Sequence, residues 1–244
     1  MSKTVIIDKE FDMFATLIIK NIGNLYTCDD KFTIYRHAFI ALYHDKIIDI
    51  GQHDYHKWIE DGTYVIDAAS RAVIPGLIEP RFELPPGRSK WDVYRKAEEC
   101  YYYHQMNGTL TICMTKHYKN PNPLLQDLIQ VDAFQPVLEN LEDCKNTKNY
   151  LISCKPGVVS LHSMGNLLFY GQNEPEWQIL KGMTCNPAKA LGLSDRGSLE
   201  IGKLADILVL NEPDLKRYYQ AMGRPLYARI IKKGIPVYPA IRRV

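Results

Sequence analysis

The sequence predicts a fold of the α/β plus β class, in which β-rich segments at both ends of the chain flank an α/β segment. Short β-branched runs bounded by turn residues fill residues 15–74, and similar runs return near the carboxyl end. Between them, a helix-start signal precedes one more β-branched run, as in a helix–strand unit. This layout predicts that the two ends pair in one sheet layer.

The amino-terminal elements are predicted to be short strands. Their sequences are ATLIIKNI (15–22), AFIALYH (38–44), KIIDIG (46–51) and TYVIDA (63–68), followed by RAVIPGLIE (71–79). The second and third strands are separated only by Asp45, so we expect a hairpin with His44-Asp45 at its tip.

The middle of the chain predicts a helix that begins after Ser89. Ser89 can cap it, and Asp92 stands at the capping-box spacing and suits the positive end of the helix dipole. Trp91, Tyr94, Ala97, Tyr101 and Gln105 are expected on one face. Asn107-Gly108 ends the helix, and TLTICMT (109–115) is the next strand.

The following segments carry weaker patterns. PLLQDLIQ (123–130) and QPVLENLEDC (135–144) suggest short helices, whereas NYLISC (149–154) and GVVSLH (157–162) suggest strands. NEPEWQILKGM (173–183) and NPAKALG (186–192) suggest helices, the second with Asn186 as cap and Pro187 at its first position. GSLEIGKLADILVLN (197–211) and ARIIKKGIPVY (228–238) suggest strands again.

Composition excludes several classes of protein. The net charge of +2, from 30 basic and 28 acidic residues, gives no electrostatic footprint for nucleic acid or for an anionic membrane. The six cysteines form no C-x-x-C pair, which favours a reducing compartment. Acidic residues near the amino terminus argue against a secretory signal, and the longest uncharged run (156–173) is too polar to span a membrane. We therefore expect a cytoplasmic protein with no nucleic-acid or membrane partner.

Two distant stretches carry a family resemblance. AFIALYHDKIIDIG and VIDAASRAVIPGLIEPRFEL lie near the amino end, and MTCNPAKALGLSDRGSLEIGKLADILVLN lies near the carboxyl end. They resemble the amidohydrolase superfamily, the metal-dependent hydrolases that include dihydroorotase, hydantoinase and imidazolonepropionase. In that family the two ends form a small β-sandwich beside a (β/α)8 barrel.

The resemblance implies a composite β-sandwich with a truncated barrel-like insert. Residues 1–74 and 193–244 would form the sandwich domain, and residues 75–192 the barrel-like domain. A complete (β/α)8 barrel takes roughly 250 residues, so this insert has room for only part of one.

The chain differs from the family pattern a second time at the metal site, after the short barrel-like insert. The family motif V-x-P-G-L-I-D-x-H-x-H falls on residues 73–83, where Arg81 and Glu83 occupy the two histidine positions. Arginine keeps its proton and offers no lone pair, so Arg81 cannot be a ligand. The family's last-strand Asp has no counterpart, because no Asp lies between Asp143 and Asp195.

These departures leave two hypotheses for function. The first is a binding or assembly module without hydrolytic activity or cofactor, in which Arg81, Glu83, His117 and His162 line a vestigial pocket. The alternative is a compact hydrolase of non-peptide carbon–nitrogen bonds, with zinc held by Glu83, His117 and His162. His117 and His162 follow predicted strands, where α/β proteins place functional residues. An incomplete barrel leaves sheet edges open, so we also expect a homodimer, with a small molecule as a further potential ligand.

Overall fold

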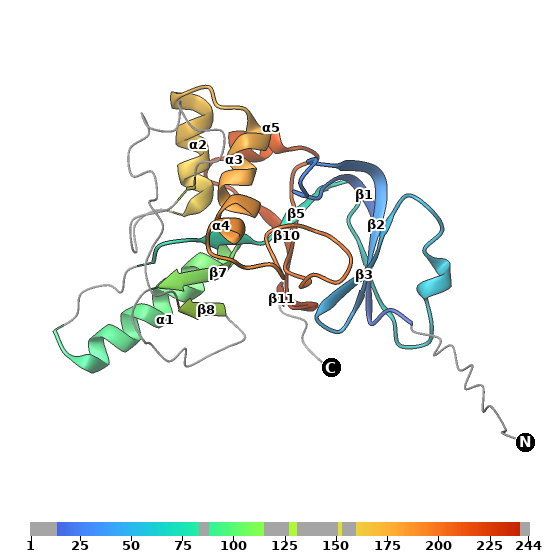
Figure 1. Cartoon of the computed structure of the whole chain (residues 1–244), viewed down its shortest axis with the longest axis horizontal. Helices are drawn as coiled ribbons and strands as arrows, with labels where there is room; N and C mark the ends of the chain where they lie inside the picture. Colours follow the sequence, from blue (N-terminus) through green and yellow to red (C-terminus); the bar gives the residue numbers. More distant parts are fainter. Residues whose placement is uncertain (1–13, 83–87, 115–126, 131–150, 153–159, 240–244) are drawn as a thin grey trace, which may run out of the picture.

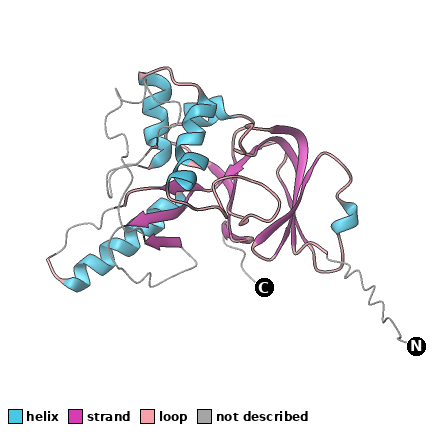
Figure 2. Ribbon diagram, in the orientation of Figure 1, coloured by secondary structure: helices cyan, strands magenta, loops and turns pink. Residues whose placement is uncertain are grey.

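The structure is a computed structural model that describes residues 14–82, 88–114, 127–130, 151–152 and 160–239. It contains a larger mixed sheet and a smaller parallel sheet, with helices beside the smaller one (Figures 1 and 2). Eight strands form the larger sheet: β1 (Leu17–Tyr26), β2 (Ile34–Tyr43), β3 (Lys46–Gly51), β4 (Tyr64–Asp67), β5 (Ala72–Pro75), β9 (Ile207–Leu210), β10 (Tyr227–Lys232) and β11 (Ile235–Tyr238).

The larger sheet joins the two ends of the chain, as the sequence predicts. Its strand order is β11-β10-β9-β5-β1-β2-β3, with β4 pairing with β1 as well. The two ends meet where β5 pairs antiparallel with β9, at Val73 opposite Val209. The predicted hairpin is confirmed: β2 pairs antiparallel with β3, and His44 between them takes a positive φ of 51°.

The smaller sheet is parallel and contains three strands. These are β6 (Leu77–Glu79), β7 (Thr109–Met114) and β8 (Asp127–Gln130), in the order β6-β7-β8. Helix α1 (Lys90–Met106) connects β6 to β7 and starts as predicted, because the Ser89 side chain accepts a hydrogen bond from the Asp92 N–H at 3.1 Å. A parallel strand–helix–strand unit of this kind is the repeating element of an α/β fold.

Gly76 lies between the two sheets. It separates β5 of the larger sheet from β6 of the smaller one, and its N–H donates to the Asp206 carbonyl at 2.8 Å. A methyl group at Gly76 would come within 2.8 Å of the Leu110 side chain on β7. The absence of a side chain therefore allows β7 to pack closely against the joint.

Four further helices stand beside the smaller sheet. They are α2 (Leu161–Gly171), α3 (Glu176–Met183), α4 (Cys185–Ala190) and α5 (Leu215–Gln220), and one 3-10 turn spans His56–Trp58. Helices α2, α3 and α5 pack together (Figure 1). Their buried aromatic and aliphatic residues join those of β5, β7, β9 and β10 in one core.

Several predicted elements are wrong. The segment GVVSLH was expected to be a strand, but Leu161 and His162 begin helix α2, whose cap is Ser160. PLLQDLIQ was expected to be a helix, but residues 127–130 form strand β8. Helix α4 begins at Cys185 after Thr184 rather than at an Asn186 cap. Trp91, expected on the buried face of α1, is 80% exposed.

Further predictions differ from the structure or lie outside the described residues. Residues 197–206 contain no strand, because turns with positive φ at Gly197 and Gly202 occupy this segment. Helix α5 has no counterpart among the predicted elements. The expected helix over 135–144 lies outside the described residues, as do parts of the segments 123–130, 149–154 and 157–162.

Candidate active-site end of the parallel sheet

The carboxyl ends of β6 and β7 lie side by side. The two strands pair in parallel, with Ile78 opposite Thr111, and the pairing extends beyond β6 because Phe82 N–H donates to the Cys113 carbonyl at 2.8 Å. In α/β proteins this end of the strands carries the functional residues. Arg81, the first of the expected pocket residues, follows β6 at this end and is half-buried.

Glu79 uses its carboxylate to stabilise the turn that follows β6. Its side chain is fully buried, and Oε1 accepts the Arg81 backbone N–H at 3.0 Å. The carboxylate thus binds its own backbone two residues on, as an Asx-type turn does with a longer side chain.

Phe82 packs into the contact between α1 and β7. It is 3% exposed and packs with Ala97, Tyr101 and Ile112. Its ring lies 5.6 Å from the ring of Tyr101. Phe82 therefore anchors the segment after β6 to α1 and β7.

Cys113 is the thiol nearest this strand end. Burial, together with the nearby charge of Glu79, raises its pKa to about 12. A nucleophilic or metal-binding cysteine needs an electropositive setting that lowers the thiol pKa. Cys113 therefore stays protonated at neutral pH and behaves as a small core residue.

His162 lies at the other end of the parallel sheet. It sits in the first turn of α2, is 4% exposed, and its Nε2 donates to the Tyr218 carbonyl at 2.9 Å. The Tyr218 hydroxyl bonds that of Tyr227, which in turn donates to the Asn107 carbonyl just before β7 begins. The structure therefore does not bring His162 together with Arg81.

The described residues at the carboxyl end do not fit a zinc ion. Arg81 has no lone pair, and Cys113 is a protonated thiol. Across the described part of the chain, no group of three His, Cys, Asp or Glu side chains is placed to hold a metal. Glu83 and His117, the other two expected ligands, lie outside the described residues.

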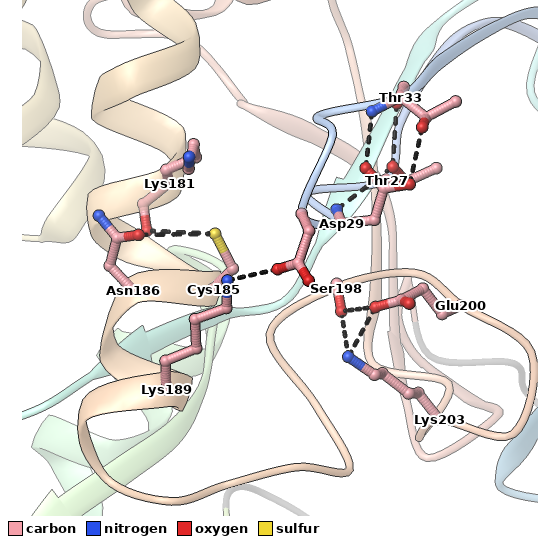
Figure 3. Close-up of polar contacts among 11 residues, drawn as sticks. Thr27, Asp29, Thr33, Lys181, Cys185, Asn186, Lys189, Ser198, Glu200 and Lys203 are labelled. Carbon is pink, nitrogen blue, oxygen red and sulfur yellow. Dashed lines mark hydrogen bonds and ion pairs between the residues drawn. The ribbon is translucent and has the colours of Figure 1, made fainter. Parts of the chain in front are cut away.

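A charged cavity of 410 Å³ lies beside this sheet, between α4 and the 194–203 turns. Arg196 reaches from it to β7, where Nη1 donates to the Thr111 hydroxyl at 3.1 Å. Lys203 bonds both Ser198 and Glu200 (Figure 3). Lys189 pairs with Asp30 across the cavity mouth.

The charges of this cavity are balanced, and none of its described lining residues is an activated nucleophile. Each of its lysines and arginines has a carboxylate partner, since Arg196 also forms a two-point ion pair with Asp195. The Cys28 and Cys185 thiols at its base have pKa values raised by burial. Sequence reasoning missed both Arg196 and the role of Glu79. Spacing alone gives no signal for a contact between residues 196 and 111.

The comparisons with known proteins agree on one family. An amidohydrolase family model matches residues 128–236. Imidazolonepropionase from Deinococcus radiodurans is 44% identical over 57 residues, which are 23% of this chain and 14% of that enzyme. Imidazolonepropionase from Symbiobacterium thermophilum is 38% identical over 58 residues, again 23% of this chain and 14% of the relative. The matched segment thus spans about a seventh of each curated relative.

Solved structures show the same fold at low identity. An amidohydrolase from an environmental sample of the Sargasso Sea has a TM-score of 0.67 at 11% identity, covering 91% of this chain and 92% of that one. Atrazine chlorohydrolase TrzN from Arthrobacter aurescens TC1, solved in complex with zinc, has a TM-score of 0.55 at 12% identity, covering 90% and 94%. Within the described residues, no helix has the length and apolar character to cross a membrane.

Proposed function

We infer the function of this chain from its family, because the chain belongs to the amidohydrolase superfamily. We propose that it contributes to hydrolysis of a non-peptide carbon–nitrogen bond in a small cyclic amide. The likeness to two imidazolonepropionases carries this proposal. Those relatives are matched over a short segment only, so the substrate ring is proposed as a class.

We propose zinc as the metal, although the described residues alone do not form a set of zinc ligands. Metal-dependent members of the family use zinc to activate water, and TrzN was solved with zinc bound. The sequence predicts Glu83, His117 and His162 as its ligands, and the His162 Nε2 donates to the Tyr218 carbonyl at 2.9 Å. Glu83 and His117 remain its proposed ligands, and we assign no catalytic step to them.

Metal content and turnover test the hydrolase proposal together. The purified full chain is analysed for zinc by mass spectrometry and assayed with hydantoin and imidazolone rings, before and after treatment with a chelator. We expect bound zinc, ring opening, and loss of ring opening on chelation. Glu83→Ala should lower both readouts, and Glu98→Ala, on the surface of α1, serves as the matched control. A chain free of metal and inactive on every ring would overturn the proposal.

A second candidate is a binding or assembly module without hydrolysis. The observation that favours it is Arg81 at the first histidine position, beside a Glu79 carboxylate that binds backbone. Under this proposal, a chelator leaves the melting temperature and the assembly state unchanged. A melting temperature that falls on chelation and recovers with zinc would refute it.

We further propose the arrangement and setting of the chain. The larger sheet would be the composite β-sandwich (residues 1–74 and 193–244), and residues 75–192 a partial barrel. The protein would act in the cytoplasm as a homodimer whose second copy covers the open side of the parallel sheet. Light scattering at micromolar concentration tests the dimer, and a monomer would contradict it.

A further inference from the structure

A second cavity lies at the amino end of the parallel sheet, away from the carboxyl ends of β6 and β7. It has a volume of 690 Å³ and is lined by the end of α1, the first turns of α2, and the segment that joins α5 to β10. This volume lies within the range of small-molecule sites. We call it the amino-end pocket.

The floor of the amino-end pocket is polar and rigid. Ser160 is 2% exposed, and its hydroxyl accepts the Ser163 N–H at 3.2 Å and lies 3.0 Å from the Ser163 hydroxyl. Only one of these two hydroxyls can donate to the other, which leaves one hydroxyl hydrogen for a ligand. His162 beside them is fixed by its bond to the Tyr218 carbonyl.

The amino-end pocket contains one cationic side chain, Arg224. Arg224 lines it and gives Nη2 to Glu212 at 2.9 Å, so other donors of its guanidinium remain for a ligand. The first turn of α2 adds the positive end of a helix dipole. Burial lowers the pKa of His162, so its ring adds no charge at neutral pH. Among the described residues that line the pocket, none carries a carboxylate side chain.

Apolar side chains form the rest of the wall. Met106 comes from α1, Leu167 from α2, and Met222 and Leu226 from the segment after α5. Leu167 and Met222 are more than half exposed, which is unusual for large apolar side chains near each other. A ligand with an apolar body would cover them while its charged end reaches the serine hydroxyls and Arg224.

We propose that the amino-end pocket binds a small organic carboxylate with an apolar chain or ring. The carboxylate would accept bonds from Arg224 and from the Ser160–Ser163 hydroxyl pair. Charge-assisted bonds of this kind are stronger than neutral ones. The site is independent of the proposed hydrolysis, which belongs to the opposite end of the strands.

Calorimetry with matched probes tests this proposal on the full chain. 4-Phenylbutyrate carries the carboxylate and an apolar body, 4-phenylbutan-1-ol carries the same body without charge, and inorganic phosphate carries charge without the body. We expect 4-phenylbutyrate to bind about tenfold more tightly than either comparator, as for one charge-assisted hydrogen bond. Equal binding of acid and alcohol, or no binding of the acid at millimolar concentration, would overturn the proposal.

Two variants locate the binding. Arg224→Gln should weaken 4-phenylbutyrate about tenfold and leave 4-phenylbutan-1-ol unchanged. Ser163→Ala should weaken the acid by a smaller factor. Arg95→Gln, an exposed arginine on α1 that also pairs with carboxylates, is the control. A loss with Arg95→Gln equal to that with Arg224→Gln would place the acid elsewhere and refute the site. The assay uses no turnover, so a failed hydrolysis test leaves this result unaffected.

Discussion

The ion pair between Lys232 and Asp206 is predicted to couple the two sheets. Lys232 lies in β10 of the larger sheet, and its Nζ is 2.9 Å from Asp206 Oδ2. The same ammonium donates to the Leu110 carbonyl, on β7 of the smaller sheet, at 2.7 Å. Both side chains are buried, at 3% and 7% exposure. Asp206 Oδ1 also accepts the Lys233 N–H at 2.8 Å.

Removal of one partner should be much more harmful than removal of both. Lys232→Met takes the ammonium away from the buried Asp206 carboxylate, and Asp206→Asn takes the Asp206 charge away from the buried Lys232 ammonium. Each change should lower the free energy of unfolding by about 3–5 kcal/mol. In the double variant neither charge remains, so its loss should fall short of the sum of the single losses by about 2 kcal/mol.

Urea unfolding followed by tryptophan fluorescence measures all four proteins. Lys57→Met is the control, because Lys57 is more than half exposed and its pairing with Asp49 at 3.3 Å should contribute less than about 1 kcal/mol. The reasoning fails if the single losses add within about 0.5 kcal/mol in the double variant. It also fails if Lys232→Met destabilises the chain no more than Lys57→Met does.

Three other changes test the packing. His104 is fully buried, neither of its ring nitrogens has a hydrogen-bond partner among the described residues, and burial lowers its pKa from 6.5 to about 4. The imidazole therefore binds a proton more tightly in the unfolded chain than in the folded one, so up to about 3 kcal/mol of stability should be lost as pH falls from about 6.5 to 4. Urea unfolding at several pH values measures this loss. In His104→Leu the free energy of unfolding should depend less on pH over the same range. Gly197 and Gly202 both have positive φ, but a methyl group at Gly197 would lie 2.5 Å from the Ala188 Cβ, whereas a methyl group at Gly202 would meet open space. Gly197→Ala should therefore lower the melting temperature more than Gly202→Ala does. Phe82→Ala should cost about 3–5 kcal/mol by urea unfolding, and a loss under about 1 kcal/mol would contradict its place in the core.

The sequence correctly predicted elements that depend on residues close to one another in the chain. The Ser89 cap of α1 and the hairpin at His44-Asp45 depend on residues within a few positions of one another. The pairing of the two chain ends was also predictable, because both read as short strands with nothing else to cover them. Recognition of the family at both ends pointed to the same arrangement.

The misassigned elements depend on distant partners. Residues 127–130 form a strand because they pair with Thr111–Met114 of β7, whereas the apolar run alone fits a helix equally well. Helix α5 has only six residues and owes its start to the Asp214 side chain, which accepts the Arg217 N–H at 2.8 Å. His162 left its predicted strand because Ser160 caps a helix there. His162 therefore lies in the first turn of α2 and not at the end of a strand.

The stretch from Val73 to Phe82 shows how packing alone can preserve part of a family motif. Val73 pairs with Val209, and Gly76 must admit Leu110, so both sheets constrain these positions whether or not a metal is bound. Phe82 is held by α1 in the same way. Arg81, which follows β6 at this strand end, is half-buried. The packed residues therefore reflect the fold, whereas Arg81 and Glu83 occupy the two histidine positions of the family motif.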